Sequence, residues 1–363
     1  FNASGYNRKF VDDYNSGHTA SLKAPFNDLN SFHNYGQINN YDDPIQCVTG
    51  DLLDLPDLKT EDVEVREALK AAYTDWAKLG VDGFRIDTVK HVETDFWNDF
   101  CPKIRSEVVG KNFFQFGEVL IGYHPTLANY VSETGMDSVL NYDLYYVMRT
   151  VFGNAPDPYH TNATNELTKE LKRRSYYSRN SAQDLLVNFI DNHDNNRFLT
   201  DTNGSLNRLW MALTYLMTTK GIPCIYYNTE NNIFGDTNIG RKDMPDFTVT
   251  NKRTFTLIRV LSKIRKENVA LRRGEIEVLK DSDTPGIFAF VRFNSDMNEN
   301  VFVLLNTSGQ TINETIDMSK YASNGAELKN ILYKEFGLEE SIAVADGSIT
   351  VSIPAYSMKI FKL

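Results

Sequence analysis

The spacing of hydrophobic positions divides the chain into three parts. Residues 1–58 show little periodicity and are rich in Asn, Asp, Gly, Tyr and Phe, which predicts an irregular, loop-dominated segment. From residue 60, apolar side chains such as Leu69, Trp76 and Leu79 recur at helical spacing, and the predicted helix ends at Gly80.

Short β-like runs and helix-like stretches then alternate up to about residue 272. The β-like runs lie at 83–86, 112–117, 137–140, 185–190 and 223–227. The helix-like stretches between and after them lie at 94–110, 142–152, 164–174, 205–219 and 251–266. Strands that alternate with helices predict a parallel sheet with helical crossovers, here about five βα units.

After residue 272 the helical pattern stops and short β-rich runs follow one another. They read EIEVL, GIFAFVRF, NVFVLLNT, TINETID, SITVSI and MKIFKL, with Gly, Asp and Asn between them. This pattern predicts a separate antiparallel β domain. The domain boundaries are therefore predicted at 1–58, 59–272 and 273–363.

Composition and charge limit the classes of ligand. Of the 363 residues 41% are hydrophobic and 12% aromatic, which excludes a disordered or fibrous chain. The 38 Lys and Arg against 48 Asp and Glu leave a net charge of −10, which argues against nucleic acid and favours a neutral, polyhydroxylated or cationic ligand. No apolar run approaches the roughly 18 residues of a membrane span.

Acidic residues stand where three of the β-like runs end. Asp87 follows 83–86, Glu118 follows 112–117, and Asp194 lies in the segment DNHD after 185–190. In a (β/α) barrel, side chains at the C-terminal strand ends converge on one mouth, where such enzymes bind their substrates. Singly, each acid is also explained as a turn or helix-cap residue.

Asp87 and Glu118 lie on successive strands and have different surroundings. Neighbouring strands are about 4.8 Å apart, so the two carboxyls can lie about 5–5.5 Å apart, the separation of a retaining glycosidase. Arg85, two residues before Asp87 on the same strand face, is expected to keep that carboxylate ionised. The apolar surroundings of Glu118 are expected to raise its pKa, as an acid catalyst requires.

Five segments, in this order, resemble the α-amylase family, glycoside hydrolase family 13. They are LPDL at 55–58, VDGFRIDTVKH at 81–91, FGEV at 116–119, FIDNHD at 189–194 and GIPCIYYNTE at 221–230. The resemblance covers essentially the whole chain. It implies a (β/α)8 TIM barrel, strands four to eight of which lie in this chain, with 1–58 as an inserted loop-rich domain and 273–363 as a C-terminal antiparallel β-sandwich.

The resemblance also implies roles for the acids. Asp87 would be the nucleophile that forms the glycosyl-enzyme, Glu118 the acid/base, and Asp194 the residue that binds sugar hydroxyls and stabilises the distorted sugar. Substrate contacts are implied for five further residues: Arg85, Lys90, His91, His193 and Arg241. Arg241 is the weakest match, because Thr237 stands where the family has an acid four residues earlier.

A calcium ion is the implied cofactor. Its implied ligands are the carboxylate of Asp57 and the main-chain carbonyl of His91, and oxygen ligands suit this hard cation. The Lys90–His91 pair is typical of family members that cleave α-1,4-glucans, so starch, glycogen and maltooligosaccharides are the expected partners. Leu53, and the pair Val119 and Leu120 just after the acid, stand where cyclodextrin-forming relatives carry aromatic residues, which favours hydrolysis over transfer.

Secretion and a longer chain are also expected from the resemblance, which is closest to fungal-type and related bacterial α-amylases. Because the chain begins at FNASGYNRKF, in the inserted domain, about 100 or more residues that carry the first three strands are expected to precede it or to form a separate chain.

Three alternatives stay open at this point. The first is a cyclodextrin-forming or other α-glucan transferase, and the second is a non-catalytic glycan-binding or structural subunit. The third is a metal-dependent phosphoesterase, which would need more ligands than the six scattered His residues offer.

Overall fold

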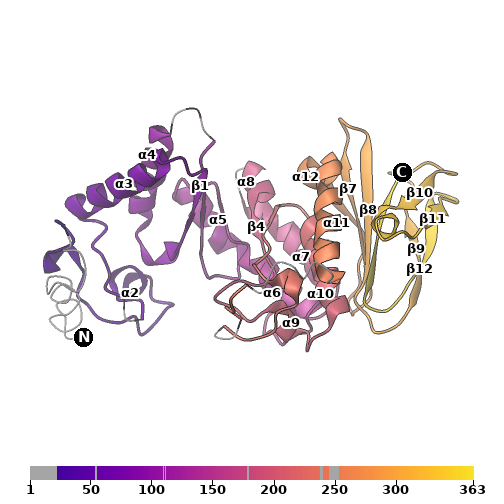
Figure 1. The fold of residues 1–363 in the computed structure, drawn as a ribbon, viewed down its shortest axis with the longest axis horizontal. Coiled ribbons are helices and arrows are strands. Elements are labelled where there is room, and N and C mark those ends of the chain that lie inside the picture. The colour runs from indigo at the N-terminus through magenta and orange to yellow at the C-terminus, as the bar shows by residue number, and fades with distance from the viewer. Residues whose placement is uncertain are drawn as a thin grey trace. The chain divides into compact units, whose positions relative to one another are not determined.

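The computed structural model describes residues 23–53, 55–108, 110, 112–177, 180–237, 240–244 and 253–363, of which 180 and 181 are described by their backbone alone. The chain forms two compact units (Figure 1). Unit 1 comprises residues 1–121 and 125–140, and unit 2 comprises residues 122–124 and 141–363. In the part of the chain that the structure describes, no helix is long and apolar enough to cross a membrane.

Unit 1 contains a parallel sheet of three strands in the order β1 (Gly83–Ile86), β2 (Phe114–Gly117) and β3 (Ser138–Val139). The predicted strands at 83–86, 112–117 and 137–140 are confirmed. Between residues 23 and 58 the described helices are short, namely η2 (Leu29–Ser31) and α2 (Pro44–Thr49), which agrees with the predicted loop-dominated segment.

Helices follow and precede these strands. They are α3 (Val63–Lys78), η3 (Val89–His91), α4 (Thr94–Glu107) and α5 (His124–Glu133), of which η3 and α5 were not predicted. Asp62 caps α3 by accepting hydrogen bonds from the backbone of Glu64 and Val65, which satisfies amides that the helix itself cannot. Gly80, with a φ of +108°, then turns the chain away after α3 in a conformation that suits glycine.

Unit 2 continues the alternation of helices and strands. It begins with α6 (Tyr142–Val151), α7 (Asn165–Arg173), η4 (Arg174–Tyr176), α8 (Asn180–Leu185), β4 (Val187–Asn188), α9 (Phe198–Asp201), α10 (Leu206–Thr218), β5 (Ile222–Pro223), η5 (Thr229–Asn231), α11 (Arg253–Glu267) and α12 (Val269–Arg273). β4 and β5 pair in parallel. The strand predicted at 223–227 is therefore shorter and earlier than expected.

The C-terminal part of unit 2 is antiparallel, as predicted. Its elements are β6 (Glu275–Lys280), β7 (Ile287–Asn294), β8 (Glu299–Asn306), β9 (Ile312–Asp317), β10 (Glu327–Asn330), α13 (Ile331–Lys334), β11 (Ser341–Ala343), β12 (Ser348–Ile353) and β13 (Ser357–Lys362). One sheet has the order β11-β10-β13-β8-β7-β6, and β9 pairs with β12 in a second.

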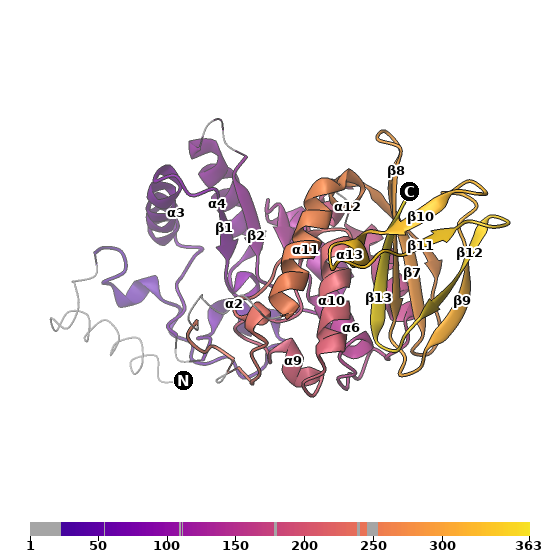
Figure 2. The ribbon, with the colours of Figure 1, turned by 45° about the vertical axis from the view of Figure 1, so that its right-hand side comes forward.

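The long apolar run of β7 is explained by burial on both faces of its sheet. Phe288 and Phe290 point to the core that α10, α11 and α12 share with the sheet, next to which these helices lie in Figure 2. Ala289 and Val291 point to the opposite core, which β9 and β12 close. A strand that is covered on both sides needs no polar alternation, so its sequence is almost continuously apolar.

Candidate functional site

Two acids stand side by side at the end of the parallel sheet of unit 1. Ile86, the last residue of β1, pairs with Gly117, the last residue of β2. Asp87 and Glu118 are the next residues on their strands. The Glu118 amide donates to the Ile86 carbonyl at 2.7 Å, so the pairing of the two chains extends up to the acids.

The two acids differ in exposure. The Asp87 side chain is 63% exposed and forms an ion pair with Arg85, two residues earlier. Glu118 is only 9% exposed. Arg85 and Asp87 lie on the wall of a cavity of about 450 Å³ in unit 1 that Asp57 and His91 also line. A substrate can therefore reach Asp87, while the position of Glu118 is fixed by the protein around it.

The backbone beside Asp87 is strained. Thr88 has a φ of +50°, in the left-handed region that a β-branched residue adopts at a cost of about 1–3 kcal/mol. The next residues are held from two sides, because the Val89 amide donates to the Glu118 carbonyl at 3.1 Å and the Trp97 indole donates to the Val89 carbonyl at 3.0 Å. Strain that is held in place in this way is typical of functional sites.

Lys90 and His91 follow in the short helix η3. The Lys90 ammonium lies 5.7 Å from the centre of the Tyr41 ring, a cation–π contact. The His91 Nδ1 lies 3.0 Å from the carbonyl oxygen of Cys47, and burial lowers the pKa of this imidazole. Both predicted contact residues are thus tied to the loop-rich segment that precedes α3.

Three further predicted site residues form a cluster in unit 2. His193 Nε2 lies 3.0 Å from one Asp194 carboxylate oxygen, and an Arg241 guanidinium nitrogen lies 2.9 Å from the other. Arg241 also donates to the His193 carbonyl at 2.7 Å. The structure therefore brings Asp194, His193 and Arg241 together.

Asp87 and Glu118 belong to unit 1 and Asp194 to unit 2. The convergence of all three acids on one substrate stays a prediction.

A buried ion pair in the same segment of the chain, Asp191 and Arg197, was not predicted as part of the site. Arg197, 1% exposed, lies 3.5 Å from the Asp191 carboxylate through its Nε and donates to the Tyr227 carbonyl at 2.7 Å. Burial raises the pKa of Asp191 to about 6, although Arg197 and a hydrogen bond from the Phe198 amide oppose this. Arg197 joins the segment after β4 to that after β5. Its place in DNHDNNR was the only signal in the sequence.

Carboxyl groups gather around Asp57, the predicted calcium ligand. Its carboxylate contacts His33 Nδ1 at 2.5 Å, and His33 Nε2 lies 3.0 Å from Glu61. Ligand atoms of His33, Glu61 and Glu93 lie within 4.8 Å of one another. Burial raises the pKa of Asp57 to about 6, against the opposing effect of His33, and the negative charges of Glu93 and Asp51 make smaller contributions in the same direction as burial. A divalent cation would relieve this repulsion, so the donor set fits a hard cation.

Comparisons with known proteins agree with this fold. The family model of the α-amylase catalytic domain matches residues 12–254. The chain is 36% identical over 220 residues to an α-amylase of Saccharomycopsis fibuligera, covering 58% of this chain and 40% of that protein. It is 31% identical over 254 residues to a cyclomaltodextrin glucanotransferase of Thermoanaerobacterium thermosulfurigenes, covering 68% and 34%.

A solved structure of an Anoxybacillus α-amylase matches 99% of this chain and 73% of its own, with a TM-score of 0.82 and 28% identity. The predicted fold class, the later strands of a (β/α)8 barrel followed by a C-terminal antiparallel β-sandwich, is confirmed. The chain spans less than half the length of the two curated relatives named above. From the matched family model and the shared fold, the chain belongs to the α-amylase family, glycoside hydrolase family 13.

Proposed function

We propose that the protein is a retaining glycoside hydrolase that cleaves α-1,4-glucosidic bonds of starch, glycogen and maltooligosaccharides. The observation that carries this proposal is the pair Asp87 and Glu118, one residue beyond the paired ends of β1 and β2 in a chain of the α-amylase family. Two carboxyls on neighbouring strands have the spacing at which one attacks the sugar and the other protonates the leaving oxygen.

In the proposed reaction Asp87 attacks the anomeric carbon while Glu118 gives its proton to the leaving glucan. Glu118, now ionised, then takes a proton from water, and the water releases the sugar from Asp87, so two inversions retain the α configuration. The exposure of Asp87 and the Arg85 ion pair suit a charged nucleophile that meets the substrate directly.

The remaining predicted residues have positioning and binding roles in this proposal. Asp194, oriented by His193 and Arg241, is proposed to hydrogen-bond the hydroxyls of the sugar that is attacked. Lys90 and His91 follow the nucleophile by three and four residues and are proposed to contact the glucan on the leaving-group side. A neutral substrate meets no repulsion from a protein with a net charge of −10.

Hydrolysis is proposed over cyclisation, although relatives of both kinds match the chain. Leu53 and Leu120 are exposed aliphatic side chains. Neither offers the flat aromatic face on which an acceptor sugar could stack and so compete with water for the glycosyl-enzyme. Soluble starch is expected to yield linear maltooligosaccharides, and chromatography of the products tests this. Cyclic dextrins as the main early product would favour the transferase instead.

We further propose that a calcium ion binds to Asp57 and to the main-chain carbonyl of His91. The crowding of Asp57 with Glu93 and Asp51 supports a cation at this place. The ion would fix the loop-rich segment and need not touch the reacting atoms.

Chelation by EDTA is expected to lower the melting temperature of the protein by several degrees, because the carboxylates then lose the ion that offsets their repulsion. Differential scanning calorimetry with EDTA, followed by added Ca²⁺ or Mg²⁺, checks this. Recovery with Ca²⁺ alone agrees with the proposal, whereas an unchanged melting temperature in EDTA would contradict it.

The domain boundaries at 58/59 and 272/273 and the secretion of the protein are likewise proposals. The change from loop-rich to helical pattern supports the first boundary, and the end of α12 at Arg273 supports the second. Secretion is supported by the substrate class, since polymeric starch does not enter cells.

A further inference from the structure

Unit 2 contains a pocket of about 290 Å³ to which its helical part and its antiparallel part both contribute. We call it the Arg208 pocket; its polar lining is Asn154, Asn162, Arg208, Thr307, Ser308 and Tyr356. The other described lining residues are a valine, a proline and a glycine, so this lining contains no carboxylate. The volume lies just below the range of about 300–1,000 Å³ of common ligand pockets, which suits a small ligand.

Arg208, the third residue of α10, is held in place by two contacts. One terminal guanidinium nitrogen donates to the Phe152 carbonyl at 2.9 Å, and the other donates to the Tyr356 hydroxyl at 3.0 Å. The guanidinium carbon lies 4.3 Å from the centre of the Tyr356 ring, a cation–π contact. The guanidinium is therefore oriented in advance, and it loses little conformational entropy when it binds a ligand.

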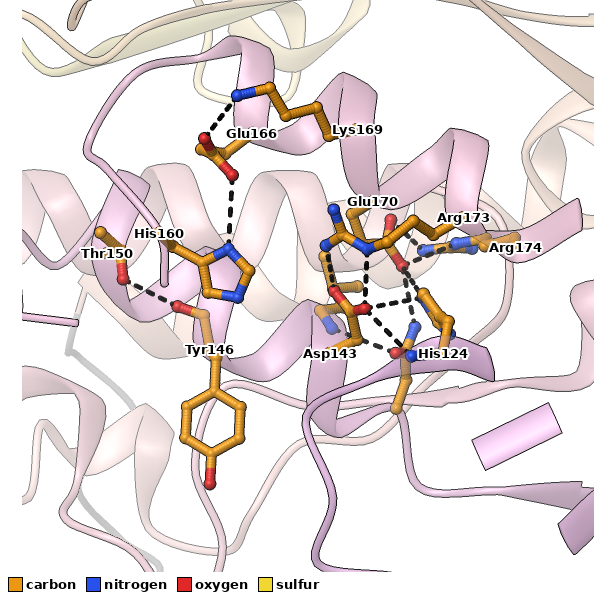
Figure 3. A network of polar contacts seen from close by, with 12 residues as sticks. His124, Asp143, Tyr146, Thr150, His160, Glu166, Lys169, Glu170, Arg173 and Arg174 are labelled. Atoms are coloured by element: carbon orange, nitrogen blue, oxygen red, sulfur yellow. Dashed lines mark hydrogen bonds and ion pairs between the residues drawn. The ribbon is translucent and has the colours of Figure 1, made fainter. Parts of the chain in front are cut away.

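The charge of Arg208 is not matched by an acid. A guanidinium has five N–H groups and the two hydrogen bonds use two of them, so three have no partner among the described residues. Other buried or half-buried arginines of unit 2 differ in this respect. In Figure 3 Arg173 faces Asp143 and Arg174 faces Glu170, so each of these guanidiniums has a carboxylate partner.

Two asparagine side chains add further hydrogen-bond donors to the lining. The Asn162 amide donates to the Asn154 carbonyl oxygen at 2.9 Å, which orients both side chains. A side-chain amide has two N–H groups, so one of Asn162 and both of Asn154 have no acceptor among the described residues. The pocket therefore combines an uncompensated positive charge with several unused donors.

Oxygen acceptors around the pocket are already occupied. The Thr307 hydroxyl accepts a hydrogen bond from the Gly286 amide at 3.0 Å. The carboxylate of Asp283 lies outside the lining and accepts from the Asn165 side chain at the start of α7. The unused N–H groups consequently need acceptors that a ligand would bring.

We infer that the Arg208 pocket binds a small oxyanion such as inorganic phosphate, held by the guanidinium of Arg208 and the amides of Asn154 and Asn162. Guanidinium and amide N–H groups are donors that bind oxyanions, and hydrogen bonds to a charged partner are the stronger ones. The protein as a whole has a net charge of −10, so an anion would be attracted by this local arrangement and not by the overall field. The site is independent of the proposed function.

The bound ion would join the segment after α6 to α10 and the antiparallel part, and so stabilise unit 2. Differential scanning calorimetry in sodium phosphate, compared with sodium chloride of equal ionic strength, tests this. At ten times its dissociation constant, phosphate is expected to raise the melting temperature of the wild type by about 2–4 °C.

Three variants separate the site from a general effect of phosphate. Asn154→Asp places a negative charge in the lining and should lose the shift. It is expected to fold, because Asn154 is exposed, its φ of +61° suits aspartate as well, and its Oδ1 can still accept from Asn162. Arg208→Gln should lose the shift too. The control is Arg253→Gln, which removes an exposed arginine stacked on Trp210 outside the pocket and should keep it.

Isothermal titration calorimetry with phosphate measures the affinity directly. The dissociation constant is expected to rise at least about tenfold in Asn154→Asp, because the added carboxylate repels the anion. An equal phosphate shift in the wild type and all three variants would overturn the inference, and so would the absence of any shift or binding in the wild type. If Arg208→Gln does not fold, Asn154→Asp decides alone.

Discussion

Glu118→Gln is expected to lower kcat on soluble starch by at least about a thousandfold, because an amide cannot give a proton to the leaving oxygen. Asp87→Asn is expected to have an equal or larger effect, since the amide is a poor nucleophile and no glycosyl-enzyme forms. Reducing-end assays at saturating starch measure both. Both variants are expected to fold, because each replacement keeps the size of the side chain, whether the residue is buried as Glu118 is or exposed as Asp87 is.

A substrate with a fluoride leaving group separates the two roles. α-Maltosyl fluoride needs little acid assistance, so Glu118→Gln should still release fluoride in a first burst, whereas Asp87→Asn should not. Glu133→Gln, on the exposed surface of α5, is the matched control and should behave as wild type. Near-wild-type starch cleavage by either Glu118→Gln or Asp87→Asn would refute the assignment.

Glu170→Ala is expected to destabilise the protein by about 3–5 kcal/mol, because it leaves buried charge without a partner. Glu170 is fully buried in α7, where it contacts Arg174 at 2.8 Å, His124 at 3.1 Å and the Asn141 amide at 3.2 Å. Differential scanning calorimetry should show a melting temperature lower by about 6–10 °C. This network holds α7 against His124, the first residue of α5, and Asn141, which precedes α6.

The control for Glu170→Ala is Glu335→Ala, which removes a partly exposed partner of the exposed Lys263 and should cost less than about 1 kcal/mol. Equal effects of the two replacements would contradict the importance of burial.

Burial opposes the charged form of Glu170, but Arg174 and His124 more than offset this and lower its pKa to about 2. Since this pKa is below the usual value of 4.5, the stabilisation is complete above that pH and is lost as the pH falls towards 2.

The sequence predicts the elements that show a short apolar run with a clear end. Strands β1 and β2, with Asp87 and Glu118 just beyond them, follow from short apolar runs that end in an acid. β10 and β11 were missed, because they are short and only one face of β10 is buried. Helix α5 was missed as well, although Pro125 in its first turn is compatible with a helix.

Contacts between distant residues were the hardest part of the site to predict. Arg197 and Asp191 are six residues apart, but the partners of Arg197 in the segment after β5 come together only in the folded chain. The same holds for His33, which contacts Asp57 from 24 residues away. A local sequence pattern does not indicate which distant residues come into contact. It does indicate which residues directly follow a predicted strand.

The anomeric form of the first product tests the central claim most directly. ¹H NMR of maltoheptaose mixed with the intact protein should show the α-anomer of the new reducing ends before mutarotation, because attack by Asp87 and then by water retains configuration. The β-anomer as first product would contradict a nucleophilic role for Asp87. No new reducing ends at all would contradict the proposed hydrolysis itself.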